Sequence, residues 1–564
     1  MSVAVRRAGR AFELRRRVAP RLLSCERPTF AELGIYAVVL AVATGLLLGE
    51  HVRASGWYSD DWAYRSLWLQ FDSLGFWGQM DALMSSDLLA GRPTLAVYLS
   101  LVQQMLGPRQ GAHLAWAAVL AVVFSGCVYL LLRNLRFRPL DAGLVGLLLL
   151  VFPGSDSTRI WAMISDAQVA MSLVLLGVVC GLAALSASGR RAVALRVSAS
   201  VLMFLGLTIY ELTFGALLLT FLLYRSRVPW KRALRAGAID WLTVALTWLL
   251  VLRNSNAERL KPAAAIDHGW VVLKQIFELF ATVALPFDSV GAGIVIALVV
   301  VGLAVVVVRK LPAGDPTRAA LIGWLWTAAV SVAFLAGAYV IYAPSSPMYV
   351  PLAPGLLNRT NAFGALPLIV LVYSLGALVA VLVFRGLSHE RGWAAAATAA
   401  IALAIGIDYT AGITHHLRLW DSGWARAHAA LERYKVSAPA PTRYGLVVMY
   451  GVPMQEADGI PVWAHNWDFE GALALTYHDA TIRGRPAFPG TFIECRAGDA
   501  KLLNTLYSGV VLPHDDAAYG SLILFDGNTG RYARPRNRKE CREQAPTFIP
   551  GPLVAPDPGA WRPG

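Results

Sequence analysis

Runs of apolar residues, each about long enough to cross a lipid bilayer, recur along this chain up to residue 407. Residues 33–49 and 366–384, for example, contain no charged side chain. A bilayer core of about 30 Å is crossed by a helix of about 20 apolar residues. Because 56% of the chain is hydrophobic and only 15% is charged, a soluble fold would have to bury many such helices completely. The pattern therefore predicts an α-helical multi-pass membrane protein.

We expect about eleven crossings on the basis of run length. Their approximate ranges are 33–49, 112–132, 140–152, 167–185, 194–209, 212–223, 239–252, 290–308, 319–342, 366–384 and 393–407. Two other apolar segments, 94–106 and 268–285, are short or amphipathic. We expect them to form helices that lie on the membrane surface or dip into it.

The distribution of arginine and lysine residues predicts the orientation of the chain in the membrane. Eight arginines precede the first apolar run, and further basic groups occupy alternate short connections, at 133–138, 190–191, 225–235, 309–310 and 385–391. Because basic loops stay on the cytoplasmic side, we expect a cytoplasmic N-terminus and insertion in the plasma (inner) membrane. The formal charge of +14 then reports topology and contact with anionic membrane lipid. No nucleic-acid partner is expected.

The composition changes after Thr410, where no further run is long enough to span a membrane. Residues 443–451 and 519–527 resemble buried strands bounded by glycine, and 463–477 has helical spacing, so we expect a small extracytoplasmic α/β domain. Cys495 and Cys541 fall in it and can form a disulfide there. The predicted organisation is a basic cytoplasmic segment (1–30), a transmembrane domain with outer catalytic loops (31–410), the extracytoplasmic domain (411–545) and a proline-rich tail (546–564).

A polar stretch at 57–93 follows the first expected crossing and contains two adjacent carboxylates, Asp60 and Asp61, among aromatic residues. Such a stretch can be an interfacial aromatic belt with solvated acids. Alternatively, the acids can supply a general base, or bind a divalent cation such as Mg²⁺ or Mn²⁺. No His, Cys or acid spacing in the chain matches a tetrahedral metal site. Metal use is therefore left open.

The arrangement resembles the GT-C superfamily of membrane glycosyltransferases, which use polyprenyl-phosphate sugars. In that superfamily an acidic pair follows the first span, with an aromatic residue three positions after the second acid, as in Asp60, Asp61 and Tyr64. The Gly-Arg-Pro turn at 91–93 is similar to a loop end in related bacterial enzymes. Asp166, in the sequence ISDAQVAMSL, matches the superfamily's second acidic position at the start of the fourth span. The resemblance covers about the first 225 residues.

The resemblance implies roles for particular residues. Asp60 would be the general base that deprotonates the acceptor hydroxyl, with Asp61 beside it and Asp166 as the second acid, a role for which Asp156 competes. The negative charge that develops on the leaving phosphate calls for a cation. The candidates are Arg92, Arg159, Arg259, Lys261 and Arg359, of which Arg159 and Arg359 are favoured because they occupy short outer loops. The expected substrate-binding residues are Tyr64, Arg92, Asp156, Arg159, Trp161, Glu211 and Arg359.

The sequence thus favours a membrane enzyme that transfers a hexosyl or pentosyl group, with inversion, from a polyprenyl-phosphate donor to an extracytoplasmic glycan, lipid or protein. A multi-pass transporter or lipid flippase of the cell envelope is the main alternative. Such carriers commonly show paired, interrupted spans in two related halves. A third alternative, an envelope-assembly scaffold, would tolerate loss of Asp60.

Overall fold

The computed structural model describes residues 28–71, 73–85, 89, 91–254, 261–285, 287, 289–504 and 516–556. Three of the sequence-based interpretations fall outside the described residues in whole or in part. They concern the basic segment up to residue 27, Arg259 and the last part of the tail, 557–564.

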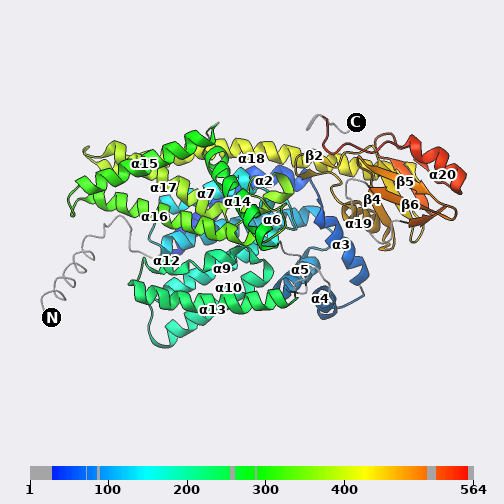
Figure 1. The fold of residues 1–564 in the computed structure, drawn as a ribbon. Coiled ribbons are helices and arrows are strands. Elements are labelled where there is room, and N and C mark those ends of the chain that lie inside the picture. The colour runs from blue at the N-terminus through cyan, green and yellow to red at the C-terminus, as the bar shows by residue number, and fades with distance from the viewer. Residues whose placement is uncertain are drawn as a thin grey trace.

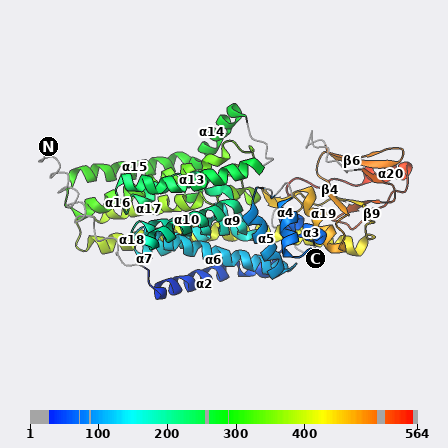
Figure 2. The ribbon, with the colours of Figure 1, turned by 90° about the horizontal axis from the view of Figure 1, so that it is seen from below.

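Nine helices among the described residues are long and apolar enough to cross a membrane. They are α2 (Phe30–Ala54), α6 (Gln110–Asn134), α9 (Ser165–Ala184), α10 (Gly189–Ile209), α13 (Trp230–Asn254), α15 (Val290–Lys310), α16 (Pro316–Tyr339), α17 (Ala365–Phe384) and α18 (Glu390–Ser437). A shorter apolar helix, α7 (Pro139–Val151), lies among them. Figures 1 and 2 show these helices running roughly along one long axis, with the strands gathered at one end. The prediction of a helical multi-pass membrane fold with a C-terminal α/β domain is confirmed.

Helix α17 lies at the centre of the bundle. Its sequence is apolar on every side, which is typical of a helix surrounded by other helices, and most of its residues are buried. It packs against α16, α18 and α7. The helix starts at Ala365, shortly after a 3-10 segment, η5 (Gly355–Asn361). The packing of α17 therefore fixes the position of the residues on η5.

The expectation of one crossing helix over 212–223 is wrong. The segment forms three short pieces, η2 (Glu211–Thr213), α11 (Phe214–Leu217) and α12 (Thr220–Tyr224). Gly215 lies so close to the backbone of Gly337 in α16 that a Cβ atom would clash with the Gly337 carbonyl oxygen. This apolar run is therefore buried inside the protein. The length of an apolar run alone does not distinguish such a buried segment from a short membrane-spanning helix.

The boundary predicted between 410 and 411 falls inside a continuous helix. Helix α18 has 48 residues, which corresponds to about 72 Å at 1.5 Å per residue. Beyond Ile407 it carries buried residues at helical spacing, including Tyr409, Ile413, Trp420 and Trp424. This buried face contacts the C-terminal domain as well as the outer loops. The helix therefore connects the membrane bundle directly to the α/β domain.

The C-terminal domain has a mixed four-stranded sheet in the order β4-β1-β8-β9. Strands β1 (Leu446–Tyr450) and β8 (Leu522–Asp526), both expected from the sequence, pair in parallel, as do β1 and β4 (Arg483–Pro486). The short β9 (Tyr532–Ala533) pairs antiparallel with β8. Helix α19 (Asn466–Tyr477) covers β4 on one side and contacts the membrane domain on the other.

A second sheet contains β5 (Thr491–Cys495), β6 (Asp499–Asn504) and β7 (Asp516–Ala518), and a small pair contains β2 (Gln455–Ala457) and β3 (Ile460–Pro461). A disulfide joins Cys495 to Cys541 of α20 (Arg538–Gln544), with 6.0 Å between their Cα atoms. This is the pair that the sequence indicates.

Short helices form the connections at the strand-bearing end of the bundle. These are α3 (Asp60–Phe71), α4 (Phe76–Met84), α5 (Pro93–Leu106), η1 (Pro153–Ser155) and α8 (Ser157–Ile160). The helices expected at 94–106 and 268–285 are found as α5 and as α14 (Pro262–Glu278), which continues into a π-helical turn, η3 (Leu279–Ala284). Figures 1 and 2 both show α3 beside α19 of the C-terminal domain.

Candidate functional site

Asp60 and Asp61 have opposite environments at the start of α3. Asp61 is only 1% exposed, and one of its carboxylate oxygens accepts a hydrogen bond from the Tyr58 backbone N–H at 3.0 Å. Among the described residues, its other oxygen has no hydrogen-bond partner. Burial raises the pKa of Asp61 to about 7. Asp61 therefore closes the turn that begins α3, while the side chain of Asp60 remains 26% exposed.

Asp60 is contacted by residues from two distant segments. The indole N–H of Trp467, in α19, donates a hydrogen bond to one carboxylate oxygen at 3.0 Å. The guanidinium group of Arg359, on η5, lies 3.7 Å from the other oxygen. A solvent-accessible carboxylate is thus held between the membrane domain and the C-terminal domain.

Aromatic rings hold Arg359 in place. Its guanidinium carbon lies 5.5 Å from the centre of the Trp161 ring and 5.8 Å from that of Tyr349, which is the range of cation–π contact. The Trp161 indole N–H in turn donates to the Tyr58 carbonyl oxygen at 3.1 Å. Burial alone would lower the pKa of Arg359, but Tyr210, Tyr349 and Asp60 outweigh burial and raise it. Arg359 is therefore a fixed, permanent cation.

A second cation, Arg92, lies at the N-terminal end of α5 in the Gly-Arg-Pro turn. It forms a 2.5 Å ion pair with Glu211, and its guanidinium carbon lies 5.4 Å from the centre of the Tyr210 ring. Both partners in the ion pair keep between a quarter and a third of their side-chain surface exposed. Burial acts to lower the pKa of Arg92, yet Glu211 and Tyr210 raise it overall. Arg92 thus remains charged and accessible.

Tyr64 and Asp166 complete this group. Tyr64 follows Asp60 by one helical turn, so both side chains project from the same face of α3. Burial raises the pKa of Tyr64, and the charges of Asp60, Arg92, Asp166 and Arg359 all act on its hydroxyl. Asp166, near the start of α9, is 5% exposed, and within the described part of the chain one of its oxygens lacks a hydrogen-bond partner.

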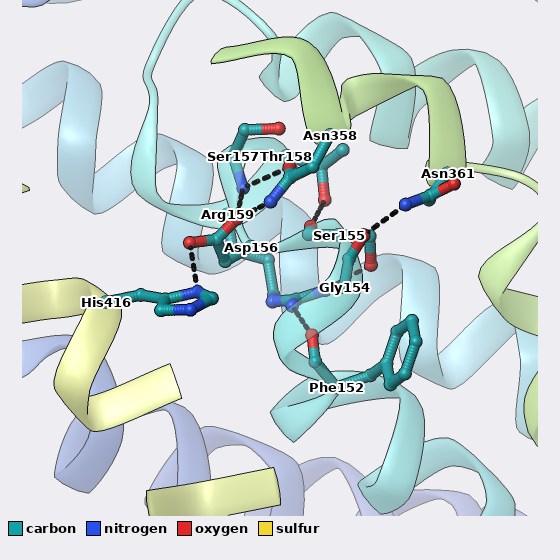
Figure 3. Close-up of polar contacts among 10 residues, drawn as sticks. All are labelled: Phe152, Gly154, Ser155, Asp156, Ser157, Thr158, Arg159, Asn358, Asn361 and His416. Atoms are coloured by element: carbon teal, nitrogen blue, oxygen red, sulfur yellow. Dashed lines mark hydrogen bonds and ion pairs between the residues drawn. The ribbon is translucent and has the colours of Figure 1, made fainter. Parts of the chain in front are cut away.

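Asp156 and Arg159 lie in a separate buried cluster (Figure 3). Asp156 accepts hydrogen bonds from the Ser157 backbone N–H at 2.8 Å and from the Asn358 side-chain amide, and it pairs with His416 Nδ1 at 2.9 Å. Arg159 donates to the Phe152 carbonyl oxygen at 2.5 Å and to Ser155 Oγ at 3.3 Å. These contacts tie α8 to η5 and α18. Arg159 therefore donates its hydrogen bonds to carbonyl groups at the end of α7. The acids whose charges act on Tyr64 are Asp60 and Asp166, and Asp156 is not among them.

Sequence reasoning missed the contribution of α19. The imidazole ring of His465 stacks on the indole of Trp467, with 4.3 Å between ring centres and 5° between planes. His465 Nδ1 also lies 3.2 Å from Ser59 Oγ. The buried Asp468 accepts the backbone N–H of His465 at 2.9 Å in a capping box, which fixes the start of α19. The run of aromatic residues in WAHNWDFE is the only available signal, and it does not identify the partner segment.

The carboxylates of Asp60 and Asp61 have different partners. Asp61 is bonded to the Tyr58 N–H, and Asp60 faces Arg359, whose positive charge opposes a neighbouring cation. In the part of the chain that the structure describes, no group of three or more His, Cys, Asp or Glu side chains could hold a metal ion. An Mg²⁺ or Mn²⁺ ion at this pair would therefore need further ligands from water or the donor phosphate.

No protein-family model matches this chain, and no curated protein matches it. Similar solved structures include ArnT from Cupriavidus metallidurans bound to undecaprenyl phosphate, at 14% identity and a TM-score of 0.40 over 79% of this chain and 89% of that one. ArnT in the apo state has a TM-score of 0.38.

The archaeal oligosaccharyltransferase AglB from Archaeoglobus fulgidus, in complex with an inhibitory peptide and a dolichol-phosphate, is also similar. Its identity is 14% and its TM-score 0.41, over 81% of this chain and 64% of AglB. Likeness at this identity concerns the fold alone, and at these TM-scores it is loose.

Proposed function

We propose that this chain is an integral-membrane glycosyltransferase that moves a sugar from a polyprenyl-phosphate donor to an extracytoplasmic glycan, lipid or protein. One observation carries the proposal. A partly exposed carboxylate, Asp60, lies 3.7 Å from a fixed cation, Arg359, at one end of a membrane-spanning bundle. A base beside a phosphate-binding cation is what transfer from a sugar phosphate to a hydroxyl requires.

In the proposed reaction, Asp60 accepts the proton of the acceptor hydroxyl as its oxygen attacks the anomeric carbon. The bond between that carbon and the phosphate oxygen breaks, and the electron pair leaves with the polyprenyl phosphate. Attack from the face opposite the leaving phosphate inverts the anomeric centre. Arg359 and Arg92 neutralise the charge that develops on the phosphate, which is where fixed cations accelerate such steps most.

The neighbouring residues have supporting roles in this proposal. Asp61 is a positioning residue, because its bond to the Tyr58 N–H sets the turn that orients Asp60. Trp161 orients Arg359, and Glu211 orients Arg92. Asp166 and Tyr64 each interact electrostatically with both Arg92 and Arg359, and in this proposal they bind the sugar hydroxyls. Asp156 holds η5 in place through Asn358, and Arg159 holds the connection between α7 and α8 through the Phe152 carbonyl oxygen and Ser155.

Transfer by the unmodified protein is the test of the proposed class. Membranes that contain the full-length chain are expected to transfer radiolabel from at least one member of a panel of polyprenyl-phosphate hexoses and pentoses to endogenous acceptors. Membranes without the chain serve as the blank. Absence of transfer from the whole panel, combined with movement of labelled lipid across proteoliposomes, would instead identify a flippase.

The proposed topology has its own test. Gly498 and Gly314 both have open space where a Cβ would lie, so cysteine is tolerated at either position. We expect Gly498→Cys, in the C-terminal domain, to react with a membrane-impermeant maleimide in intact cells. Gly314→Cys, between α15 and α16, should react only after lysis. The reverse pattern would place Asp60 in the cytoplasm and exclude an extracytoplasmic acceptor.

A further inference from the structure

A cavity of about 260 Å³ lies at the end of the bundle far from Asp60, between α16, α17 and α18. Helix α17 starts at Ala365, shortly after Arg359, and ends at Phe384. Its 20 residues correspond to about 30 Å, which is the full hydrocarbon thickness of a bilayer. Arg385 follows the last residue of α17 and lines the cavity. The mouth of the cavity therefore lies at the membrane surface opposite the candidate site.

The mouth of this cavity carries an excess of positive charge. Arg138, Asp141, Arg385, Glu390 and Arg391 line it. Asp141 is already bonded to Arg138 at 2.7 Å and to the Tyr373 hydroxyl at 2.8 Å. Glu390 accepts hydrogen bonds from Thr317 Oγ1 at 2.9 Å and from the Gly386 backbone N–H at 3.0 Å.

The two remaining arginines are available to a ligand. Arg385 and Arg391 are both exposed, and neither makes an ion pair or side-chain hydrogen bond within the described parts of the chain. Two guanidinium groups at a membrane surface fit a phosphate group, which accepts hydrogen bonds from both.

The rest of the cavity is an apolar groove. Along α16 its lining extends from Pro316 to Thr327, which is about 17 Å at 1.5 Å per residue and so about the depth of one leaflet. The absence of a side chain at Gly323 opens the groove beside Trp324 and Trp326. A second, almost wholly apolar cavity of about 150 Å³ adjoins it, and both are lined by Phe137, Ser226 and Trp326.

We propose that this groove binds an anionic phospholipid from the leaflet on that side of the membrane. The phosphate lies between Arg385 and Arg391, and one acyl chain follows α16 past Gly323 and Trp326. The net charge of the mouth selects an anionic over a zwitterionic headgroup, as basic pockets between membrane helices do. The depth of the groove fits a lipid that occupies a single leaflet, and the position of its mouth separates this lipid from the donor at Asp60. The proposal does not depend on the proposed enzymatic function.

Thermal unfolding of the delipidated, full-length protein in detergent tests the proposal. With matched acyl chains, phosphatidylglycerol is expected to raise the unfolding midpoint by about 2 °C or more, and phosphatidylcholine is not. The double variant Arg385→Ala/Arg391→Ala should lose this difference. Gly323→Leu should lose the response too, because the new side chain fills the groove, and it should still fold because open space surrounds Gly323.

The matched control is Arg309→Ala/Lys310→Ala, which removes two basic residues in the last turn of α15 that do not line the cavity. This variant should keep the full response to phosphatidylglycerol. Equal responses to the two lipids would overturn the proposal, as would an unchanged response in the Arg385/Arg391 variant. Loss of the response in the control would show that surface charge alone attracts the lipid. A response to polyprenyl phosphate in place of phosphatidylglycerol would assign the groove to the carrier lipid.

Discussion

Asp60→Asn is expected to lower the rate of sugar transfer by about 10²- to 10⁴-fold, because asparagine cannot accept the proton of the acceptor hydroxyl. The fold should persist, since the amide oxygen can still accept the Trp467 indole N–H that Asp60 now accepts at 3.0 Å. The measurement is the initial rate of radiolabel transfer in membranes adjusted to equal amounts of the protein. Binding of the donor should change much less than the rate.

The adjacent acid provides the matched comparison. The pKa of Asp61 is raised by burial to about 7, so near neutral pH its carboxyl group is already partly protonated, and asparagine resembles that form. The amide oxygen can also accept the Tyr58 N–H. We therefore expect Asp61→Asn to reduce transfer by less than about 10-fold, whereas loss of a general base costs at least about 100-fold.

A third variant, Glu543→Gln, removes an exposed acid from α20, which packs on β5 and β6 and not on η5 or α3. It controls for loss of an acid away from the site and should transfer at the normal rate. If Asp60→Asn were fully active, the general-base assignment would be wrong. If Asp61→Asn were inactive and Asp60→Asn active, the two acids would have exchanged roles.

Gly471→Ala is expected to produce the second large loss, although Gly471 contacts no part of the proposed substrate. A Cβ atom on Gly471 would lie 2.5 Å from the Trp62 carbonyl oxygen and 3.0 Å from the Ala63 nitrogen. Both are backbone atoms of α3, so α19 and α3 must move apart to relieve the clash. That movement withdraws Trp467 from Asp60, and a displacement of about 1 Å in a catalytic group can lower a rate by about 10²-fold.

The same substitution at Gly498 is the control, since nothing lies within 4 Å of the position that its Cβ would take. We expect Gly498→Ala to keep full activity and the normal unfolding midpoint. Gly471→Ala should lose activity and unfold at a lower temperature, because overpacking typically destabilises by about 1–3 kcal/mol. Full activity in Gly471→Ala would show that contact between the C-terminal domain and α3 is not needed for transfer.

The variant Trp467→Phe tests whether the hydrogen bond from Trp467 to Asp60 matters in addition to the position of α19. Phenylalanine retains a ring that can stack on His465 but lacks the N–H that Asp60 accepts. Loss of one hydrogen bond to a charged group is worth about 1.5–3 kcal/mol at most. This corresponds to a decrease in transfer of about 10- to 150-fold, comparable with the loss expected for Gly471→Ala. A much smaller decrease would show that α19 acts mainly by closing the site.

Much of the fold follows from local sequence. Apolar runs of sufficient length must form helices in a bilayer, because only helices satisfy their own backbone groups there. Every expected crossing except 212–223 coincides with a helix in the described structure. The prediction for 212–223 was wrong because a run of 12 residues can form either a buried segment or a short span. The close approach of Gly215 to Gly337 shows that it is buried. The end of α18 was missed because helix-forming residues continue past the membrane-length run.

The candidate site, too, was predictable from the sequence only in part. The sequence by itself determined that Asp60 and Asp61 follow the first span and that Arg92, Arg159 and Arg359 occupy loops, because run lengths and charges are local properties. Only the tertiary structure decided which of them meet. The Tyr58 N–H holds Asp61, and the carbonyl group at the end of α7 takes up Arg159. Trp467 reaches Asp60 across 407 positions of sequence, a contact that long-range packing alone creates.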